Sequence, residues 1–343
     1  MNKNDAPSPT APPDAAPACA AGGLRHALIL NGKGGARQMT PAQLDKWTPA
    51  KGTLWLHFDL GAADTADWLA SKSRLDPVIV DTILEENTPR PRCTQFGDGL
   101  LVVLRAVNAN PGLEPDDMVY LHIWVEAKRI ITFRRQPMVG IRYIRRNLNY
   151  GVGPSSAASM LDEICSTVTD RIHDTVMNLE DILDDVEDDL VNARLTDGLM
   201  GTISETRRQL STIRRYLAPQ RDIMDSIGRQ TVPWLDKKAR FQLKEIAARL
   251  FRSLEDIDNL WERCSINIDE INSKRNEQTK RNMYMISMLA TFFLPLTFVT
   301  GLLGANVGGI PLSDYEHGFA VVTATIVAMG AAMLVWFKKM KWL

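Results

Sequence analysis

The feature that most constrains this chain is a long run, residues 234–294, that contains neither glycine nor proline. These two residues end helices most readily, so nothing in the local chemistry interrupts a helix here. At a rise of ~1.5 Å per residue, a helix over residues 234–303 is on the order of 100 Å long, several times the length of an ordinary globular helix. The sequence therefore predicts one very long helix to which the other parts of the chain attach.

The first part of this helix carries apolar residues at alternating spacings of four and three. This spacing places them in one narrow seam along the helix, which faces partner helices. The predicted seam positions are Leu243, Ala247, Leu250, Leu254, Ile257, Trp261, Cys264, Ile268 and Ile271. Residues 272–282 follow without any apolar side chain, and a helix that is polar all round stands in water or faces other polar groups. We expect a stalk followed by a polar section.

Two uncharged apolar segments, residues 283–303 and 318–336, are each long enough to cross the hydrocarbon core of a bilayer. Two crossings place both chain ends on the same side of the membrane. Basic residues flank the pair at Lys274, Arg275, Lys280, Arg281, Lys338, Lys339 and Lys341, whereas the connector 304–317 has none. By the positive-inside rule, we expect both termini in the cytoplasm and the connector outside.

Composition limits the class to which the protein can belong. At 343 residues and 45% hydrophobic composition, the whole chain can bury a sizeable core, and its net charge of -1 argues against nucleic acid as a partner. The four cysteines are widely spaced and form no CxxC pair, which fits a reducing cytoplasm. Residues 1–22 are rich in alanine and proline and are expected to form a disordered tail without a secretory signal.

Between the tail and the long helix, the pattern predicts an α/β domain and then a helical hairpin. Strands are predicted at residues 24–30, 53–60, 100–107, 119–125 and 130–134, the last two as a hairpin, with helices at 62–71, 77–86 and 138–148. Residues 154–228 are expected to be helical in two pieces, broken near 196–201 and kinked at Pro219. The expected divisions are 1–22, 23–150, 151–232, 233–303, 304–317 and 318–343.

An acidic cluster ends the first of these helical pieces. Asp181, Asp184, Asp185 and Asp188 share one helical face by their spacing. One interpretation is a solvated face paired with the arginine-rich helix that follows, at Arg207, Arg208, Arg214 and Arg215. The other is a cytoplasmic rim that attracts cations, because neighbouring like charges concentrate counter-ions.

A stripe of mostly small or weakly polar residues runs along the first apolar segment. Its members are Met283, Ser287, Ala290, Leu294, Thr297 and Gly301. A face turned to lipid does not need serine, threonine and glycine, so the stripe indicates either close helix packing or the lining of a water-filled pore. Two helices cannot enclose a pore alone, so both interpretations require further copies of the chain.

The string TFFLPLTFVTGLLGAN, residues 291–306, resembles the pore helix of the CorA superfamily of divalent-cation transporters. Its end is similar to the family's Gly-x-Asn signature at Gly304 and Asn306, with Ala305 where the magnesium branch has methionine. The following VGGIP makes it most similar to the ZntB branch of zinc transporters. WLHFDL at 55–60 and RRYLAPQR at 214–221 extend the resemblance from about residue 24 to the end.

The resemblance implies a CorA-like homopentameric funnel in the inner membrane, with a cytoplasmic α/β domain and five long helices lining the pore. It also implies a selectivity filter at Gly304, Ala305 and Asn306, where a ring of asparagine side chains contacts the hydrated ion transiently. Neutral carboxamide oxygens can bind a hydrated divalent ion without trapping it. Without the family, Asn306 could equally cap the end of the helix.

The outer connector departs from the MPEL-like segment of the magnesium branch and places Asp314, Glu316 and His317 near the mouth. The two carboxylates are expected to attract cations, and an imidazole is a good zinc ligand, although an ordinary polar loop would have the same residues.

The hypothesis is transport of divalent cations, Zn²⁺ by the family branch, with uptake favoured by the acidic connector and no resident cofactor. Proton coupling, proposed for this branch, has no intramembrane carboxylate to serve it. One alternative is a CorA-type Mg²⁺ or Co²⁺ channel, and another is a membrane-anchored coiled-coil scaffold without transport. An enzyme is the least favoured class, because no nucleophile, base and orienting group occur at a motif-like spacing.

Overall fold

The computed structural model describes residues 22–85, 90–108, 110, 112, 117–192, 198–305 and 316–340. The chain forms two compact units, divided between Asn267 and Ile268. We call them the sheet unit and the span unit. The predicted tail, apart from its last residue, lies outside the described residues.

The sheet unit is built on seven strands in the order β2-β1-β3-β7-β6-β5-β4. Their bounds are β1 Leu24–Leu30, β2 Ala36–Gln38, β3 Leu54–Asp59, β4 Arg92–Phe96, β5 Gly99–Ala106, β6 Val119–Glu126 and β7 Arg129–Arg134. Only β3 and β7 pair in parallel among these neighbours; the other pairs are antiparallel. All five predicted strands are confirmed, and so is the β6–β7 hairpin.

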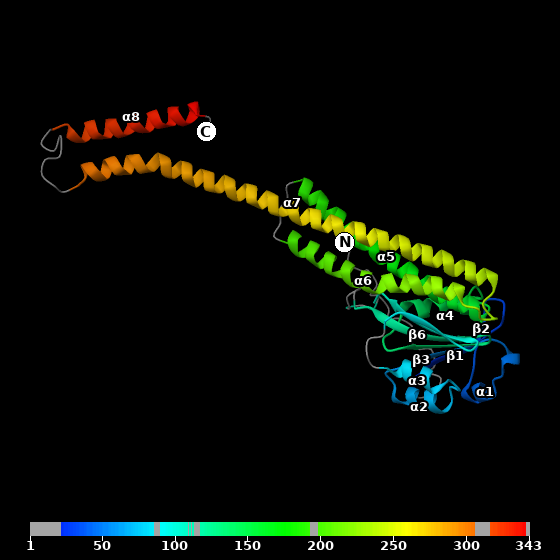
Figure 1. The fold of residues 1–343 in the computed structure, drawn as a ribbon. Coiled ribbons are helices and arrows are strands. Elements are labelled where there is room, and N and C mark those ends of the chain that lie inside the picture. Colours follow the sequence, from blue (N-terminus) through cyan, green and yellow to red (C-terminus); the bar gives the residue numbers. More distant parts are fainter. Residues whose placement is uncertain are drawn as a thin grey trace, which may run out of the picture. The chain divides into compact units, whose positions relative to one another are not determined.

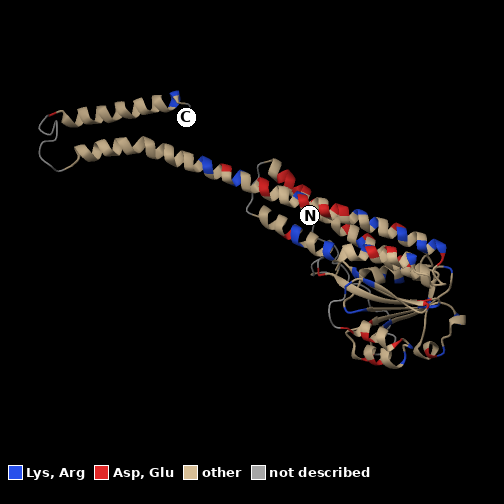
Figure 2. Cartoon of the chain, in the orientation of Figure 1, with Lys and Arg blue, Asp and Glu red and all other residues tan. Residues whose placement is uncertain are grey.

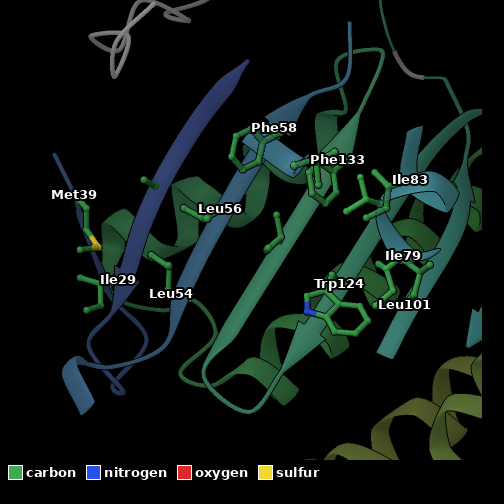
Figure 3. Close-up of a cluster of buried hydrophobic side chains, with 14 residues drawn as sticks. Ile29, Met39, Leu54, Leu56, Phe58, Ile79, Ile83, Leu101, Trp124 and Phe133 are labelled. Atoms are coloured by element: carbon green, nitrogen blue, oxygen red, sulfur yellow. The ribbon is translucent and has the colours of Figure 1, made fainter. Parts of the chain in front are cut away.

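One face of the sheet is covered by short helices, as Figure 1 shows. They are α1 Pro41–Asp45, the 3-10 turn η1 Pro49–Lys51, α2 Ala63–Ser71 and α3 Pro77–Leu84. Asp76 starts α3 by accepting a hydrogen bond from the Val78 backbone N–H at 2.9 Å, and Pro77 occupies the first helical position. Figure 3 shows the core beneath this layer, where Ile79 and Ile83 pack with Phe58 and Phe133.

The opposite face is covered by α4 Val139–Tyr150 and α5 Ala157–Val191, with α6 Leu199–Arg229 alongside (Figure 1). Gly151 ends α4 in the left-handed conformation, at a φ of 78°, which favours glycine. The predicted helical hairpin is confirmed, with α5 and α6 separated near the expected break. Pro219 lies inside α6.

The long helix α7 runs from Lys237–Leu303 over 67 residues, and α8 spans Gly318–Lys339. A single helix that leads from the stalk into the first apolar segment is therefore confirmed. It contributes its first part to the sheet unit and the rest to the span unit.

Six of the nine predicted seam positions of α7 are buried, and the exceptions are Leu254, Trp261 and Ile268. Between residues 243 and 267, the buried positions are Leu243, Ile246, Ala247, Leu250, Ser253, Ile257, Leu260, Cys264 and Asn267. Trp261 is instead 38% exposed, and the Arg207 guanidinium stacks over its ring at 4.4 Å. The prediction followed apolar residues and so missed Ser253 and Asn267, although a buried polar side chain is tolerated where it is hydrogen-bonded. Asn267 meets that condition by donating to Glu187 Oε1 at 2.9 Å.

Candidate functional site

Two helices in the described part of the chain, α7 and α8, contain segments long and apolar enough to cross a membrane. Their side chains are largely exposed: Leu294 on α7 is 72% exposed and Phe319 on α8 is 86% exposed. Such contiguous apolar surface is stable only against lipid or against other protein.

Within the span unit, α8 packs against one face of α7, and the two helices lie side by side in Figure 1. The rings of Phe292 and Phe337 are 6.4 Å apart between centroids, and Phe337 is 1% exposed. A Cβ atom added at Gly330 would lie 3.8 Å from the Phe292 side chain and 4.0 Å from that of Leu296, both ordinary contact distances, so position 330 of α8 faces these two side chains of α7. The partly buried residues of this face of α7 are Met288, Phe292, Pro295, Leu296, Val299 and Leu303.

The predicted stripe lies on the opposite face of α7. All six of its members, Met283, Ser287, Ala290, Leu294, Thr297 and Gly301, are exposed. At about 100° per residue, the centre of the stripe is roughly 180° around the helix from the centre of the face that α8 covers. The stripe is thus the part of the first span furthest from α8, available to other copies of the chain.

The helix ends at the predicted filter motif. The backbone N–H of Gly304 donates to the Thr300 carbonyl at 2.9 Å, which continues the helical hydrogen bonding one residue past Leu303. A Cβ atom at position 304 would lie only 2.9 Å from that same carbonyl oxygen, so a glycine fits here without strain. Ala305 follows directly, while Asn306 and Asp314 lie outside the described residues.

The two other connector residues named above, Glu316 and His317, stand immediately before α8. Both are exposed, and the His317 carbonyl accepts the Val321 N–H at 3.1 Å at the start of the helix. Across the described residues, no three His, Cys, Asp or Glu side chains converge in a way that could hold a metal ion.

The acidic cluster on α5 is partly neutralised by an arginine of α7. Arg263 bonds Glu187 through two nitrogens, at 3.0 and 2.8 Å, and also pairs with Asp184 and Glu180. The hydrogen bond from Arg263, helped by one from Asn267, lowers the pKa of Glu187 against the opposing effect of burial. Figure 2 shows the red patch at the end of α5.

Arg263 was not predicted as a partner of this cluster, because a single arginine beside a seam gives no local signal. One of the two interpretations of the sequence paired the cluster with the α6 arginines, but among these Arg214 pairs with Asp258 of α7. Asp181, Asp185 and Asp188 remain exposed, so a solvent-facing acidic surface is left beside the paired part.

The comparisons with known proteins agree with this arrangement. Residues 50–339 match the family model described as "CorA-like Mg2+ transporter protein". The chain is 36% identical to the zinc transport protein ZntB of Pectobacterium carotovorum, over 94% of this chain and 96% of that protein. It is 37% identical to the divalent cation transporter CmaX of Pseudomonas aeruginosa, over 94% and 97% of the two chains.

A solved structure of full-length CmaX superposes with a TM-score of 0.80 at 36% identity, covering 93% of this chain and 98% of that one. A sheet domain joined by one long helix to a two-helix span defines a membrane protein of the two-span transporter class. The chain belongs to the CorA-like family. The relatives that it matches are transporters and not enzymes, as the sequence predicted.

Proposed function

We propose that this chain transports divalent cations, with Zn²⁺ as the transported ion, as a homopentamer of the inner membrane. Two relatives support this proposal: the zinc transport protein ZntB, at 36% identity, and the divalent cation transporter CmaX, at 37% identity, each over nearly the whole chain. The number of five subunits rests on the family resemblance.

The observation that carries the proposal is the position of the stripe. Because α8 covers one face of α7 and the stripe occupies the other, a ring of subunits can place α7 inside and α8 toward lipid. Each subunit then contributes Ser287, Thr297 and Gly301 to the lumen, where small and weakly polar side chains leave room for water. Met283, Ala290 and Leu294 complete the lining.

The filter is assigned to Gly304, Ala305 and Asn306 at the outer end of α7. The tight fit at Gly304 supports a sharp helix end there, and the Gly-x-Asn resemblance supports Asn306 as the residue that meets the hydrated ion. Asp314, Glu316 and His317 would concentrate cations outside, and the exposed Asp181, Asp185 and Asp188 would attract them on the cytoplasmic side.

The orientation follows from the basic flanks of the spans. Lys338 and Lys339 follow the second span and Lys280 and Arg281 precede the first, so both termini and the sheet unit are assigned to the cytoplasm. The acidic connector then lies outside the cell, where its carboxylates would concentrate cations, and this favours uptake as the direction of transport.

Flux into proteoliposomes tests the transport and the ion together. Purified protein should admit Zn²⁺ well above empty vesicles and in preference to Mg²⁺, and Asn306→Ala should lower the flux or change its selectivity. A preference for Mg²⁺ or Co²⁺ would favour the CorA-type channel. Flux equal to that of empty vesicles would leave only the scaffold alternative. The same assay with and without a pH gradient measures proton coupling.

A cysteine comparison tests the lining itself. In a background without the four native cysteines, a water-soluble thiol reagent should block flux through Thr297→Cys. Thr300→Cys is the matched control, because it makes the same change about 60° further round the helix and about 100° from the centre of the stripe. Equal block at both positions, or block only at Thr300→Cys, would contradict the proposed lining.

A further inference from the structure

A cavity of about 450 Å³ lies within the sheet unit, between α5 and the first turns of α7. The two helices run in the same direction here, as Figure 1 shows. Arg249 of α7 pairs with Asp170 of α5, and Arg263 pairs with Glu187 further along both helices. Residues 152–155, which precede α5, complete the lining, and every lining residue belongs to the described part of the chain.

A buried carboxylate lies in the wall of this cavity. Asp162 of α5 is 5% exposed, and within the described part of the chain neither of its side-chain oxygens has a hydrogen-bond partner. A buried polar group without a partner is costly, and a carboxylate more so than a neutral group. The cavity therefore offers two acceptor oxygens to a ligand that carries hydrogen-bond donors.

The other charged side chains of the lining are mixed in sign. Alongside Asp162, the carboxylates are Glu163 and Glu245, and the basic groups, all on α7, are Lys238, Arg249 and Arg252. Arg249 donates to Ser166 Oγ at 2.9 Å, one turn after Asp162 on α5. Acceptors and donors of opposite charge thus lie within about a helical turn of each other, or ~5.4 Å along the helices.

We propose that this cavity binds a small organic zwitterion, in which an ammonium group and a carboxylate are joined by a short carbon chain. The ammonium supplies three donors and meets Asp162, while the carboxylate accepts from the basic side chains of α7. The volume lies within the range of small-molecule sites. Across the described residues, no three His, Cys, Asp or Glu side chains converge to hold a metal, which favours an organic cation over a metal ion. This site goes beyond the proposed transport and does not depend on it.

The ionisation of Asp162 gives the site a signature. Burial is the main cause that raises its pKa to about 7, so the carboxyl is partly protonated near neutral pH. An ammonium partner favours the ionised form, so binding should release a proton and tighten about tenfold between about pH 6 and about pH 8. Aliphatic ammonium and carboxylate groups of a ligand do not titrate in this range. The other titratable or charged groups around Asp162 are Glu163 and Cys165 on α5, Asp236 before α7, and Lys238, Glu245, Arg249 and Arg252 on α7.

Calorimetry on the full-length protein in detergent tests the proposal. Metal-free protein is titrated separately with glycine, β-alanine, 4-aminobutyrate and 6-aminohexanoate at constant ionic strength. At least one should saturate, and the chain length that binds most tightly measures the separation of the two charged ends of the site. Butyrate and butylammonium each carry only one of the two charges and should bind at least about tenfold more weakly.

The variant that tests the site is Asp162→Asn, which should weaken binding at least about tenfold and abolish its pH dependence. Its matched control is Asp174→Asn, which removes an exposed carboxylate of α5 outside the cavity and should bind like the wild type. Lys238→Gln, expected to weaken binding from the other end of the ligand, serves if Asp162→Asn folds poorly. The proposal is overturned if no zwitterion saturates at millimolar concentration, if butyrate or butylammonium binds as tightly as the best zwitterion, or if Asp162→Asn and Asp174→Asn bind equally.

Discussion

Asp162 on α5 is a buried carboxylate whose oxygens accept no hydrogen bond from the residues that the structure describes. It is 5% exposed and lines the cavity between α5 and α7. Its pKa is raised from the ordinary value of 3.8 to about 7, mainly by burial and also by the negative charges of Asp236 and Glu163, against the opposing effect of Lys238 and Arg249. The folded protein therefore holds a proton at pH values where the unfolded chain has lost it.

The sign of the pH dependence follows from this difference. Between pH 3.8 and about 7 the folded state binds more protons than the unfolded state, so the free energy of unfolding falls as pH rises. For pKa values of 3.8 and about 7, the linkage relation gives a total loss of about 4 kcal/mol. Roughly 3 kcal/mol of this loss falls between about pH 5 and about pH 8.

Asp162→Asn removes the titrating group and keeps nearly the same shape. The variant should gain about 3 kcal/mol relative to the wild type between about pH 5 and about pH 8, because all other titrating groups are common to both proteins. Denaturant unfolding of the full-length protein in detergent, followed by tryptophan fluorescence at each pH, measures the difference.

Glu163→Gln is the control for this prediction, since it removes a half-buried carboxylate from the next position of the same helix. It should leave most of the pH-dependent loss in place. A stability difference between wild type and Asp162→Asn that stays constant across this pH range would refute the reasoning, because it would mean that Asp162 is charged throughout.

Two further predictions concern the stalk and the spans. Arg263→Gln should cost about 1 kcal/mol near neutral pH, after allowing for solvent screening of Glu187. Because the folded pKa of Glu187 is lowered, this cost should shrink as pH falls below its ordinary value of 4.5, and unfolding at several pH values checks it. Gly330→Phe should lower the thermal midpoint in detergent by pushing α8 off α7, whereas Gly330→Ala fits the available space and should leave it nearly unchanged. Equal midpoints for the two variants would contradict the observed packing.

The strands that the sequence predicted are those whose side chains are buried on both faces of the sheet. β5 is an example, with all eight residues buried and an almost unbroken apolar sequence. β2 and β4 were missed because both are edge strands with exposed polar residues, such as Arg37 and Gln95, and are short. Their apolar content is too low to give a periodic signal.

The order of the strands could not be predicted from local patterns. The parallel pairing of β3 with β7 joins segments far apart in sequence and is accompanied by buried side-chain contacts, in which Thr132 accepts from Trp55 Nε1 at 3.0 Å and lies 2.8 Å from His57 Nδ1. The presence of a threonine, a tryptophan or a histidine in the sequence does not indicate which residue it will contact. The same limit applies to Asp162 and Arg263, whose surroundings are assembled from several elements.

The stripe on α7 is defined by its helical spacing and its residue types, which make no reference to α8. The face that α8 covers is defined by burial alone. The two sets nonetheless lie on opposite sides of one helix, and they differ in kind: the covered face has bulky residues such as Met288, Phe292 and Leu296, whereas the stripe includes Ser287, Thr297 and Gly301. The bulky apolar residues of the covered face pack against α8 of the same chain. Small residues serve a surface that identical helices must approach closely or share with water, so the division of α7 into these two faces is what a subunit of a pore requires.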